Sequence, residues 1–130
     1  MASAALSLFP ERFHGAVCWM GVDFWARVPV PFAPGFSWPA SFRRPPRETL
    51  HRVESERRLA LVTGELDFNR SETRAVHRAM ERAGFEAVRY LEIPAADHYH
   101  GIDATWLAVA LAWLDGEAVP PPTPSAAPAP

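Results

Sequence analysis

The sequence predicts an α/β fold with about three parallel strands and flanking helices. Short apolar runs bounded by Gly or Pro alternate along the chain with segments whose apolar residues recur at helical spacing. Strands and helices that alternate in this way form a parallel sheet with right-handed crossovers. The hydrophobic share of 48% and the charged share of 22% are ordinary for a globular chain with one modest core.

Three apolar runs have the character of buried strands. They cover residues 15–22 (GAVCWMGV), 59–64 (LALVTG) and 87–94 (AVRYLEIP), the last of which Pro94 ends. A sheet of three strands is narrow, and one long flank would be an unpaired hydrophobic edge, which native proteins avoid. We therefore expect self-association through this edge, or, as an alternative function, a non-catalytic α/β module that pairs the edge with another chain.

The first part of the chain predicts a helix and, after the first strand, a long excursion. The opening ASAALSL reads as a helix that stops at Pro10, and Pro46 can open a short helix, RETLHRVESE. Between them, residues 23–46 alternate prolines with aromatic side chains, which is typical of a lid-like loop. Some of these side chains could line an apolar acyl or alcohol pocket, or could equally pack a cap: Trp25, Phe32, Phe36 and Trp38.

The second part predicts two further helices and a tail. In SETRAVHRAMERAGF the apolar residues share one face, Asn69 can cap the start, and Gly84 stands where a C′ glycine belongs. Asp103 caps ATWLAVALAWLDG, which is apolar over most of its circumference and is expected to pack deeply. The α/β domain therefore spans residues 1–116, and residues 117–130, rich in Pro and Ala, predict a disordered tail.

Charge and composition argue against several classes of function. The net charge is −2 without a basic block, so neither nucleic acid nor an anionic membrane is an expected partner. The opening MASAALSLFPERF has no positively charged start and Pro10 interrupts it, so we expect neither a signal peptide nor a membrane span, and a cytoplasmic location for the chain as given. The single cysteine, Cys18, lies in an apolar run and gives neither a disulfide framework nor a thiolate metal site.

Two titratable residues follow neighbouring strands at the point where each strand ends. Asp67 comes just after the second strand and His98 just after the third. Function in open parallel sheets gathers at the carboxyl ends of the strands, so both side chains are expected at one edge. An Asp beside a His can fix the tautomer of the imidazole and stabilise the imidazolium. His100 is the alternative base, and Glu65 the alternative acid.

The same loop, AADHYHGID, also offers a metal hypothesis. Asp97, His98, His100 and Asp103 are plausible ligands, and a small metal-dependent hydrolase using the two histidines is one alternative function. A site needs three or four converging ligands, however, and Asp103 is better explained as a helix cap. We therefore expect neither a metal nor another cofactor.

The spacing of these segments resembles a known family. The run LVTGELDFNRSETRAVHRAMERAGFEAVRYLEIPAADHYHGIDATWLAVALAWLD is similar to the C-terminal part of an α/β-hydrolase of the serine esterase or peptidase type, and FPERFHGAVCWMGVDFW resembles the stretch after its nucleophile helix. The resemblance covers roughly residues 2–116 and implies a partial α/β-hydrolase fold. In the family the base commonly follows a Gly, whereas Asp97 precedes His98 here.

The resemblance implies hydrolysis of a small carboxylic ester or related acyl substrate by a Ser-His-Asp mechanism, with Asp67 as the acid and His98 as the base. The family's nucleophile stands in Gly-x-Ser-x-Gly between a strand and a helix. Because this chain opens inside what looks like that helix, we expect the elbow ahead of Met1 and a chain that is inactive alone. Ser37, in PGFSWPA, is a weak alternative nucleophile, since prolines precede it and Pro39 prevents a following helix.

Overall fold

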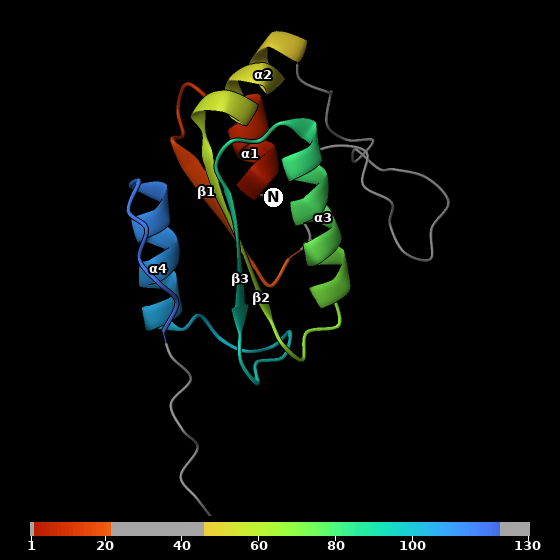
Figure 1. Ribbon diagram of the computed structural model, residues 1–130, viewed down its shortest axis with the longest axis vertical. Coiled ribbons are helices and arrows are strands. Elements are labelled where there is room, and N and C mark those ends of the chain that lie inside the picture. The colour runs from red at the N-terminus through yellow and green to blue at the C-terminus, as the bar shows by residue number, and fades with distance from the viewer. Residues whose placement is uncertain (1, 22–45, 123–130) are drawn as a thin grey trace, which may run out of the picture.

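The computed structural model describes residues 2–21 and 46–122, and it confirms an α/β fold with a three-stranded parallel sheet and flanking helices (Figure 1). The elements follow one another as α1 (Ala2–Leu8), β1 (Gly15–Trp19), α2 (Arg47–Glu56), β2 (Arg58–Gly64), α3 (Arg70–Ala83), β3 (Val88–Ile93) and α4 (Ala104–Leu114). The predicted loop aromatics Trp25, Phe32, Phe36 and Trp38, together with Ser37, lie outside the described residues, as do residues 123–130 of the predicted tail.

The sheet has the order β1-β2-β3, and both pairings are parallel. The register pairs Gly15 with Arg58 across β1 and β2, and Leu59 with Val88 across β2 and β3. β2 is central, and every residue from Leu59 to Gly64 is buried, as its uninterrupted apolar sequence predicts. β1 is shorter than predicted because Met20, with a φ of 50°, turns the chain out of the extended conformation.

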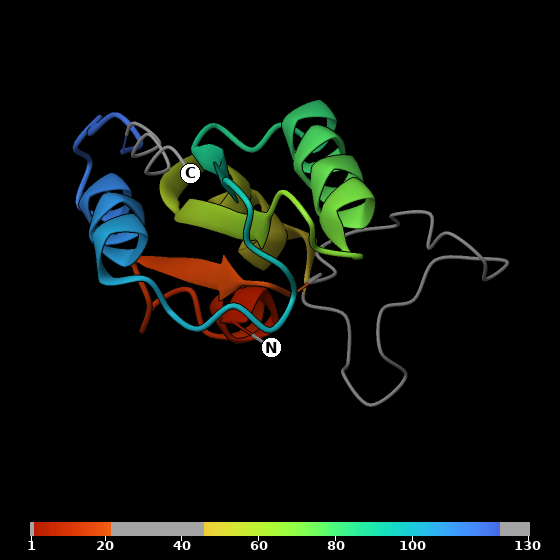
Figure 2. The same cartoon turned by 90° about the horizontal axis from the view of Figure 1, so that it is seen from below.

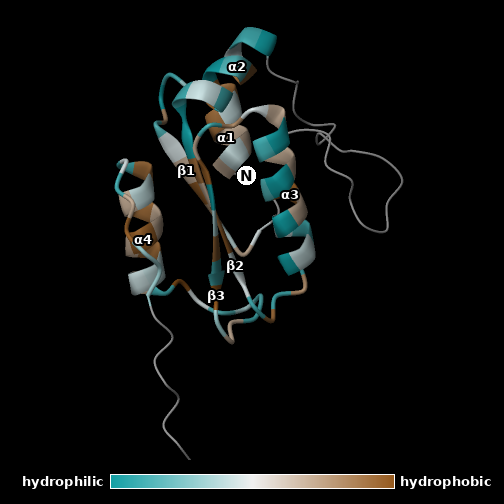
Figure 3. Cartoon of the chain, in the orientation of Figure 1, coloured by the Kyte–Doolittle hydropathy of each residue, from teal (hydrophilic) through white to brown (hydrophobic). Residues whose placement is uncertain are grey.

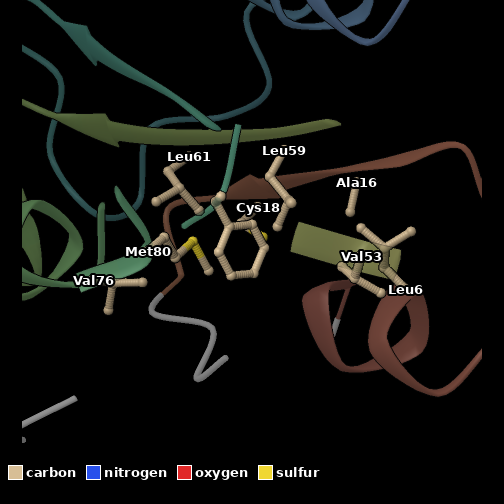
Figure 4. Packing of buried hydrophobic residues seen from close by; sticks show 9 residues of the cluster. Leu6, Ala16, Cys18, Val53, Leu59, Leu61, Val76 and Met80 are labelled. Carbon is tan, nitrogen blue, oxygen red and sulfur yellow. The ribbon is translucent and has the colours of Figure 1, made fainter. Parts of the chain in front are cut away.

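Two hydrophobic clusters cover the two faces of the sheet. On one face the side chains of α1, α2 and α3 pack against the strands, and Figure 4 shows Leu6 with Val53 on one side of Cys18 and Met80 with Val76 on the other, all in one cluster. On the other face α4 packs against all three strands and is the one helix of the described residues on that side (Figure 2). The sheet is thus the middle layer of three. Because its strands are parallel, their carboxyl ends all lie at one edge of the sheet.

The helix ends follow the predicted capping pattern with one exception. Gly84 adopts the left-handed conformation, with a φ of 96°, at the end of α3. The carboxylate of Asp103 accepts hydrogen bonds from the N–H groups of Thr105 and Trp106 at the start of α4. Asn69 occupies the N-cap position of α3, but its side chain makes no capping hydrogen bond. Instead, its backbone N–H donates to the carboxylate of Asp67 at 2.8 Å.

The last helix packs less deeply than predicted. Trp106, Val109 and Ala110 are buried, yet Leu111 is 47% exposed, and Figure 3 shows α4 as mainly apolar where the outer turns of α2 and α3 are polar. An aromatic anchor holds α4 to the sheet. The indole Nε1 of Trp113 donates to the carbonyl of Leu59 at 2.9 Å.

Past α4, residues 117–122 are described, and one of them, Val119, contacts the rest of the fold. Val119 packs against the α4-side cluster, and its carbonyl accepts a hydrogen bond of 2.6 Å from the guanidinium of Arg89. Within the described ranges, none of the helices has the length and apolarity needed to cross a bilayer.

Candidate functional site

Two turns meet where β2 and β3 end. The N–H of Glu65 donates to the carbonyl of Ile93, and the N–H of Leu66 donates to that of Ala96, each at 2.9 Å. These bonds continue the β2–β3 ladder past the strands and join the turn after β2 to the segment after β3. Figure 2 shows that segment running beneath the carboxyl ends of the strands on its way to α4.

A glycine allows this close approach. A Cβ built on Gly64 would overlap the backbone carbonyl of Ala96, so no larger residue fits while the two turns keep their positions. The sequence TGELD therefore needs its glycine for contact between segments. Asp67 and His98 therefore lie on two turns that are joined by backbone hydrogen bonds and by the close contact at Gly64.

The carboxylate of Asp67 lies at the centre of this edge. Its side chain is fully buried. Oδ2 accepts a hydrogen bond of 3.1 Å from the hydroxyl of Thr63, and Oδ1 accepts one of 2.8 Å from the N–H of Asn69. Oδ1 also lies 3.1 Å from Nδ1 of His98. A buried carboxylate with several donors is held in one position, which is what an orienting acid requires.

The imidazole of His98 is held on one side and open on the other. Oδ1 of Asp67 faces Nδ1 of His98, and a carboxylate oxygen accepts a hydrogen bond. The proton of a neutral imidazole is therefore assigned to Nδ1. Nε2 then carries the lone pair, and among the described residues it has no hydrogen-bond partner. The side chain is 27% exposed. The ring can therefore accept a proton at Nε2 from a group outside the described part of the chain.

Two aromatic rings flank the imidazole. The ring of Phe68 is tilted against it at a centroid separation of 4.2 Å, and that of Tyr99 meets it edge-on at 5.4 Å. Contacts of this kind restrict the rotation of a ring in addition to the hydrogen bond at Nδ1. Sequence reasoning missed both residues and also Thr63. All three lie close to the pair in the sequence. Phe68 follows Asp67, Tyr99 follows His98, and Thr63 precedes Asp67 by four residues.

The alternative acid and base have other contacts. The carboxylate of Glu65 accepts a hydrogen bond of 2.9 Å from the N–H of Ala95, a residue with a φ of 56° in the turn after β3. Glu65 therefore stabilises a backbone conformation that favours glycine. The N–H of His100 donates to the carbonyl of Asp97, and the carboxylate of Asp97 caps the N–H of Tyr99. Neither Glu65 nor the ring of His100 joins the Asp67–His98 pair.

The four residues of the metal hypothesis are also divided among separate tasks. Asp103 caps α4, Asp97 caps a turn, and Nδ1 of His98 faces Asp67. In the described ranges, no group of three or more His, Cys, Asp or Glu side chains is arranged to hold a metal ion.

An ionic cluster fixes α3 beside β3 and thereby supports the acid turn. Glu92 of β3 accepts hydrogen bonds from Arg70 and Arg74 of α3, each at 2.7 Å, and from the hydroxyl of Tyr90 at 2.6 Å. Partial burial alone would raise the pKa of Glu92, but the hydrogen bonds from Arg70, Tyr90 and Arg74 outweigh burial and lower that pKa to about 2. Arg70 is the first residue of α3, directly after the turn that carries Asp67.

Exposed apolar side chains flank the pair in sequence, on the segment after β2 and on the segment between β3 and α4. Leu66, Phe68, Tyr99 and Ile102 are between 66% and 85% exposed. Four large apolar side chains on two joined turns are more than the scattered exposure that a surface ordinarily shows. The carboxyl edge thus combines an oriented imidazole with an apolar surround.

Comparison of the chain with protein-family models, with curated proteins and with solved structures gives no match. The interpretation of the site therefore rests on the residues themselves and on their geometry.

The contact between Gly64 and Ala96 can be tested with an added methyl group. We expect Gly64→Ala to force the two turns apart and to lower the free energy of unfolding in urea by about 1–3 kcal/mol. Gly101→Ala is the matched control, because a Cβ at Gly101 in the same region meets nothing within 4 Å. The control should stay within about 0.5 kcal/mol of the wild type. Equal effects of the two substitutions would contradict the close-approach argument.

The ionic cluster around Glu92 should make the free energy of unfolding depend on pH in the acid range. The folded-state pKa of about 2 lies below the unfolded value of 4.5, so this stabilisation is complete above pH 4.5 and is lost as the pH falls toward 2. We expect Glu92→Gln to lower the free energy of unfolding by about 1–2 kcal/mol at neutral pH. The difference between variant and wild type should shrink between pH 4.5 and pH 2. A difference independent of pH over that interval would show that charge at Glu92 does not stabilise the fold.

Proposed function

We propose that Asp67 and His98 are the orienting acid and the general base of an acyl hydrolase of the Ser-His-Asp type. The observation that carries the proposal is the 3.1 Å contact between Oδ1 of the buried Asp67 and Nδ1 of His98. Both residues follow neighbouring parallel strands, and the acid precedes the base in the chain, as in the α/β-hydrolases that the sequence resembles.

In this mechanism Nε2 of His98 takes the proton of a serine hydroxyl as its Oγ attacks the carbonyl carbon of an ester. The tetrahedral intermediate collapses to an acyl-serine, and the imidazolium returns its proton to the departing alkoxide. Water, deprotonated by the same nitrogen, then releases the acid. Asp67 stabilises the imidazolium in both steps and holds Nε2 toward the substrate.

The apolar surround supports a substrate with an apolar acyl or alcohol group. Phe68 and Tyr99 contact the ring of His98, and Leu66 and Ile102 belong to the same two segments of the chain. All four side chains leave more than half of their surface exposed. Covering these side chains with an apolar substrate group would remove them from water, at a gain of about 25 cal/mol for each Å² buried. A short aliphatic or aromatic ester fits this surround better than a charged one.

The proposed nucleophile lies outside the described residues. Two described serines donate their hydroxyls to backbone carbonyls away from His98. The hydroxyl of Ser7 donates to the carbonyl of Ser3, and that of Ser55 donates to the carbonyl of His51. No described serine hydroxyl is hydrogen bonded to His98. The proposal assigns the nucleophile and the oxyanion donors to a Gly-x-Ser-x-Gly elbow ahead of the present Met1 rather than to Ser37.

Ester hydrolysis tests both parts of the proposal. We expect the 130-residue chain to hydrolyse p-nitrophenyl acetate and butyrate no faster than buffer, because the nucleophile and oxyanion donors supply the main catalytic contributions. Ser37→Ala should leave that rate unchanged. A chain extended upstream through the elbow should hydrolyse both esters, and His98→Ala in that chain should lower kcat by a factor of about 10³ or more.

Each arm has a result that would count against the proposal. Turnover by the 130-residue chain that Ser37→Ala abolishes would place the nucleophile in the loop instead. An upstream reading frame without Gly-x-Ser-x-Gly, or an active extended chain that tolerates His98→Ala, would remove His98 as the base.

A further inference from the structure

The two oxygens of the Asp67 carboxylate have different partners. Oδ1 accepts a hydrogen bond of 2.8 Å from the N–H of Asn69 and lies 3.1 Å from Nδ1 of His98. Among the described residues, Oδ2 accepts one hydrogen bond, of 3.1 Å, from the hydroxyl of Thr63. The side chain of Asp67 has no exposed surface, so it is shielded from water that could replace a lost donor. Thr63 is therefore the one described residue that holds Oδ2.

This bond controls the plane of the carboxylate. The torsion that turns a carboxylate about its Cβ–Cγ bond is broad, so the bond itself does not select an orientation. Without the hydroxyl, Oδ2 would be buried and unsatisfied, and a turn toward the N–H of Asn69 would relieve part of that cost. The same turn would move Oδ1 out of line with Nδ1 of His98. The geometry of the acid–base pair thus depends on a donor that does not contact the imidazole.

The sheet fixes the position of Thr63. The residue lies in β2, where the parallel register pairs it with Glu92 of β3, and none of its surface is exposed. A β-branched side chain also has few χ1 rotamers open to it. The position of the hydroxyl therefore follows from the central strand, whereas Asp67 and His98 lie on turns.

Other buried hydroxyls have a different use. Those of Ser7 and Thr73 donate to the backbone carbonyls of Ser3 and Asn69, four residues earlier, as hydroxyls in helices commonly do. Such a bond satisfies the hydroxyl and orients no other side chain. The hydroxyl of Thr63 instead donates to a carboxylate that contacts the proposed base.

We propose that Thr63 is a positioning residue: its hydroxyl fixes the plane of the Asp67 carboxylate and, through it, the tautomer and direction of the imidazole of His98. Its effect on turnover rests on the proposed function. Its effect on the imidazole is a property of the 130-residue chain and is measured without any substrate.

Replacement by valine separates the hydroxyl from the shape of the side chain. In long-range ¹H–¹⁵N spectra, recorded where the imidazole is neutral, we expect Thr63→Val to lose the exclusive protonation of His98 at Nδ1 and to show both tautomers. Thr73→Val is the matched control. It removes an equally buried hydroxyl from α3, while the N–H of Thr73 still donates to the carbonyl of Asn69. This control should keep the wild-type tautomer.

Two further measurements do not depend on how well the valine variant folds. Thr63→Ala removes the hydroxyl without placing a methyl group against the carboxylate, and it should give the same mixture of tautomers. In the wild type, the hydroxyl proton of Thr63 should exchange slowly with water, because the donor is buried and hydrogen bonded. The exposed hydroxyl of Thr105 is the comparison within the same spectrum.

Turnover by the upstream-extended chain gives a readout that a purely structural residue would not move. Thr63→Val should lower kcat for p-nitrophenyl butyrate about 10- to 100-fold and leave KM within about twofold, because the lost bond acts on the base and not on substrate binding. Thr63→Ser keeps the hydroxyl and should retain kcat within about threefold, and Thr73→Val should match the wild type. Equal losses of kcat in Thr63→Val and Thr63→Ser would show that packing, and not the hydroxyl, matters.

The spectra contain the results that would overturn the inference. Exclusive protonation of His98 at Nδ1 in folded Thr63→Val or Thr63→Ala would show that the hydroxyl does not hold the pair. Both tautomers in the wild type, or an equal mixture in Thr73→Val, would remove the specific role of Thr63. A Thr63 hydroxyl proton that exchanges as fast as that of Thr105 would show that the hydrogen bond is not made.

Failure of this inference is distinguishable from failure of the proposed function. An extended wild-type chain that does not hydrolyse esters would count against the hydrolase alone, since the tautomers of the 130-residue chain decide the role of Thr63 by themselves. An active extended chain whose His98 keeps one tautomer in Thr63→Val would count against Thr63 alone.

Discussion

The close approach of Gly64 to the carbonyl of Ala96 sets the geometry of the functional edge. Because residue 64 has no side chain, the turn after β2 packs directly on the segment after β3, and two backbone hydrogen bonds extend the ladder beyond the strands. The acid and the base are then carried by two turns that behave as one unit. The ionic cluster around Glu92 adds a second constraint, because it holds Arg70, the first residue of α3, beside the sheet.

Asp67 links folding and chemistry in a single buried carboxylate. It accepts hydrogen bonds from Thr63 at the end of β2 and from the N–H of Asn69 at the start of α3, and it faces Nδ1 of His98. The contacts that fix the start of a helix therefore also fix the imidazole. The side chain of Asn69 makes no capping hydrogen bond, and its backbone N–H donates to the carboxylate two residues earlier. It also leaves Nε2 as the nitrogen available to a reacting group.

The strands, their parallel order and the position of the Asp67–His98 pair could be predicted because apolar runs and chain order determine which ends of the strands meet. Helix caps at Gly84 and Asp103 were predictable from local chemistry. The contacts of Glu65, Thr63 and Phe68 were not, because they depend on how two turns pack in space and not on periodicity. The depth of α4 was overestimated, since an apolar helix has no sequence signal for what covers its outer face, and Leu111 stays half-exposed.

The central claim is that Asp67 fixes the tautomer of His98 and leaves Nε2 as the base. Long-range ¹H–¹⁵N correlation spectra of the 130-residue chain, recorded where the imidazole is neutral, report which ring nitrogen carries the proton. The account predicts that His98 is protonated at Nδ1 in the wild type and that Asp67→Asn abolishes this strict preference, while His100 shows the same tautomer mixture in both proteins. A wild-type His98 protonated at Nε2, or one whose tautomer is indifferent to Asp67→Asn, would contradict it.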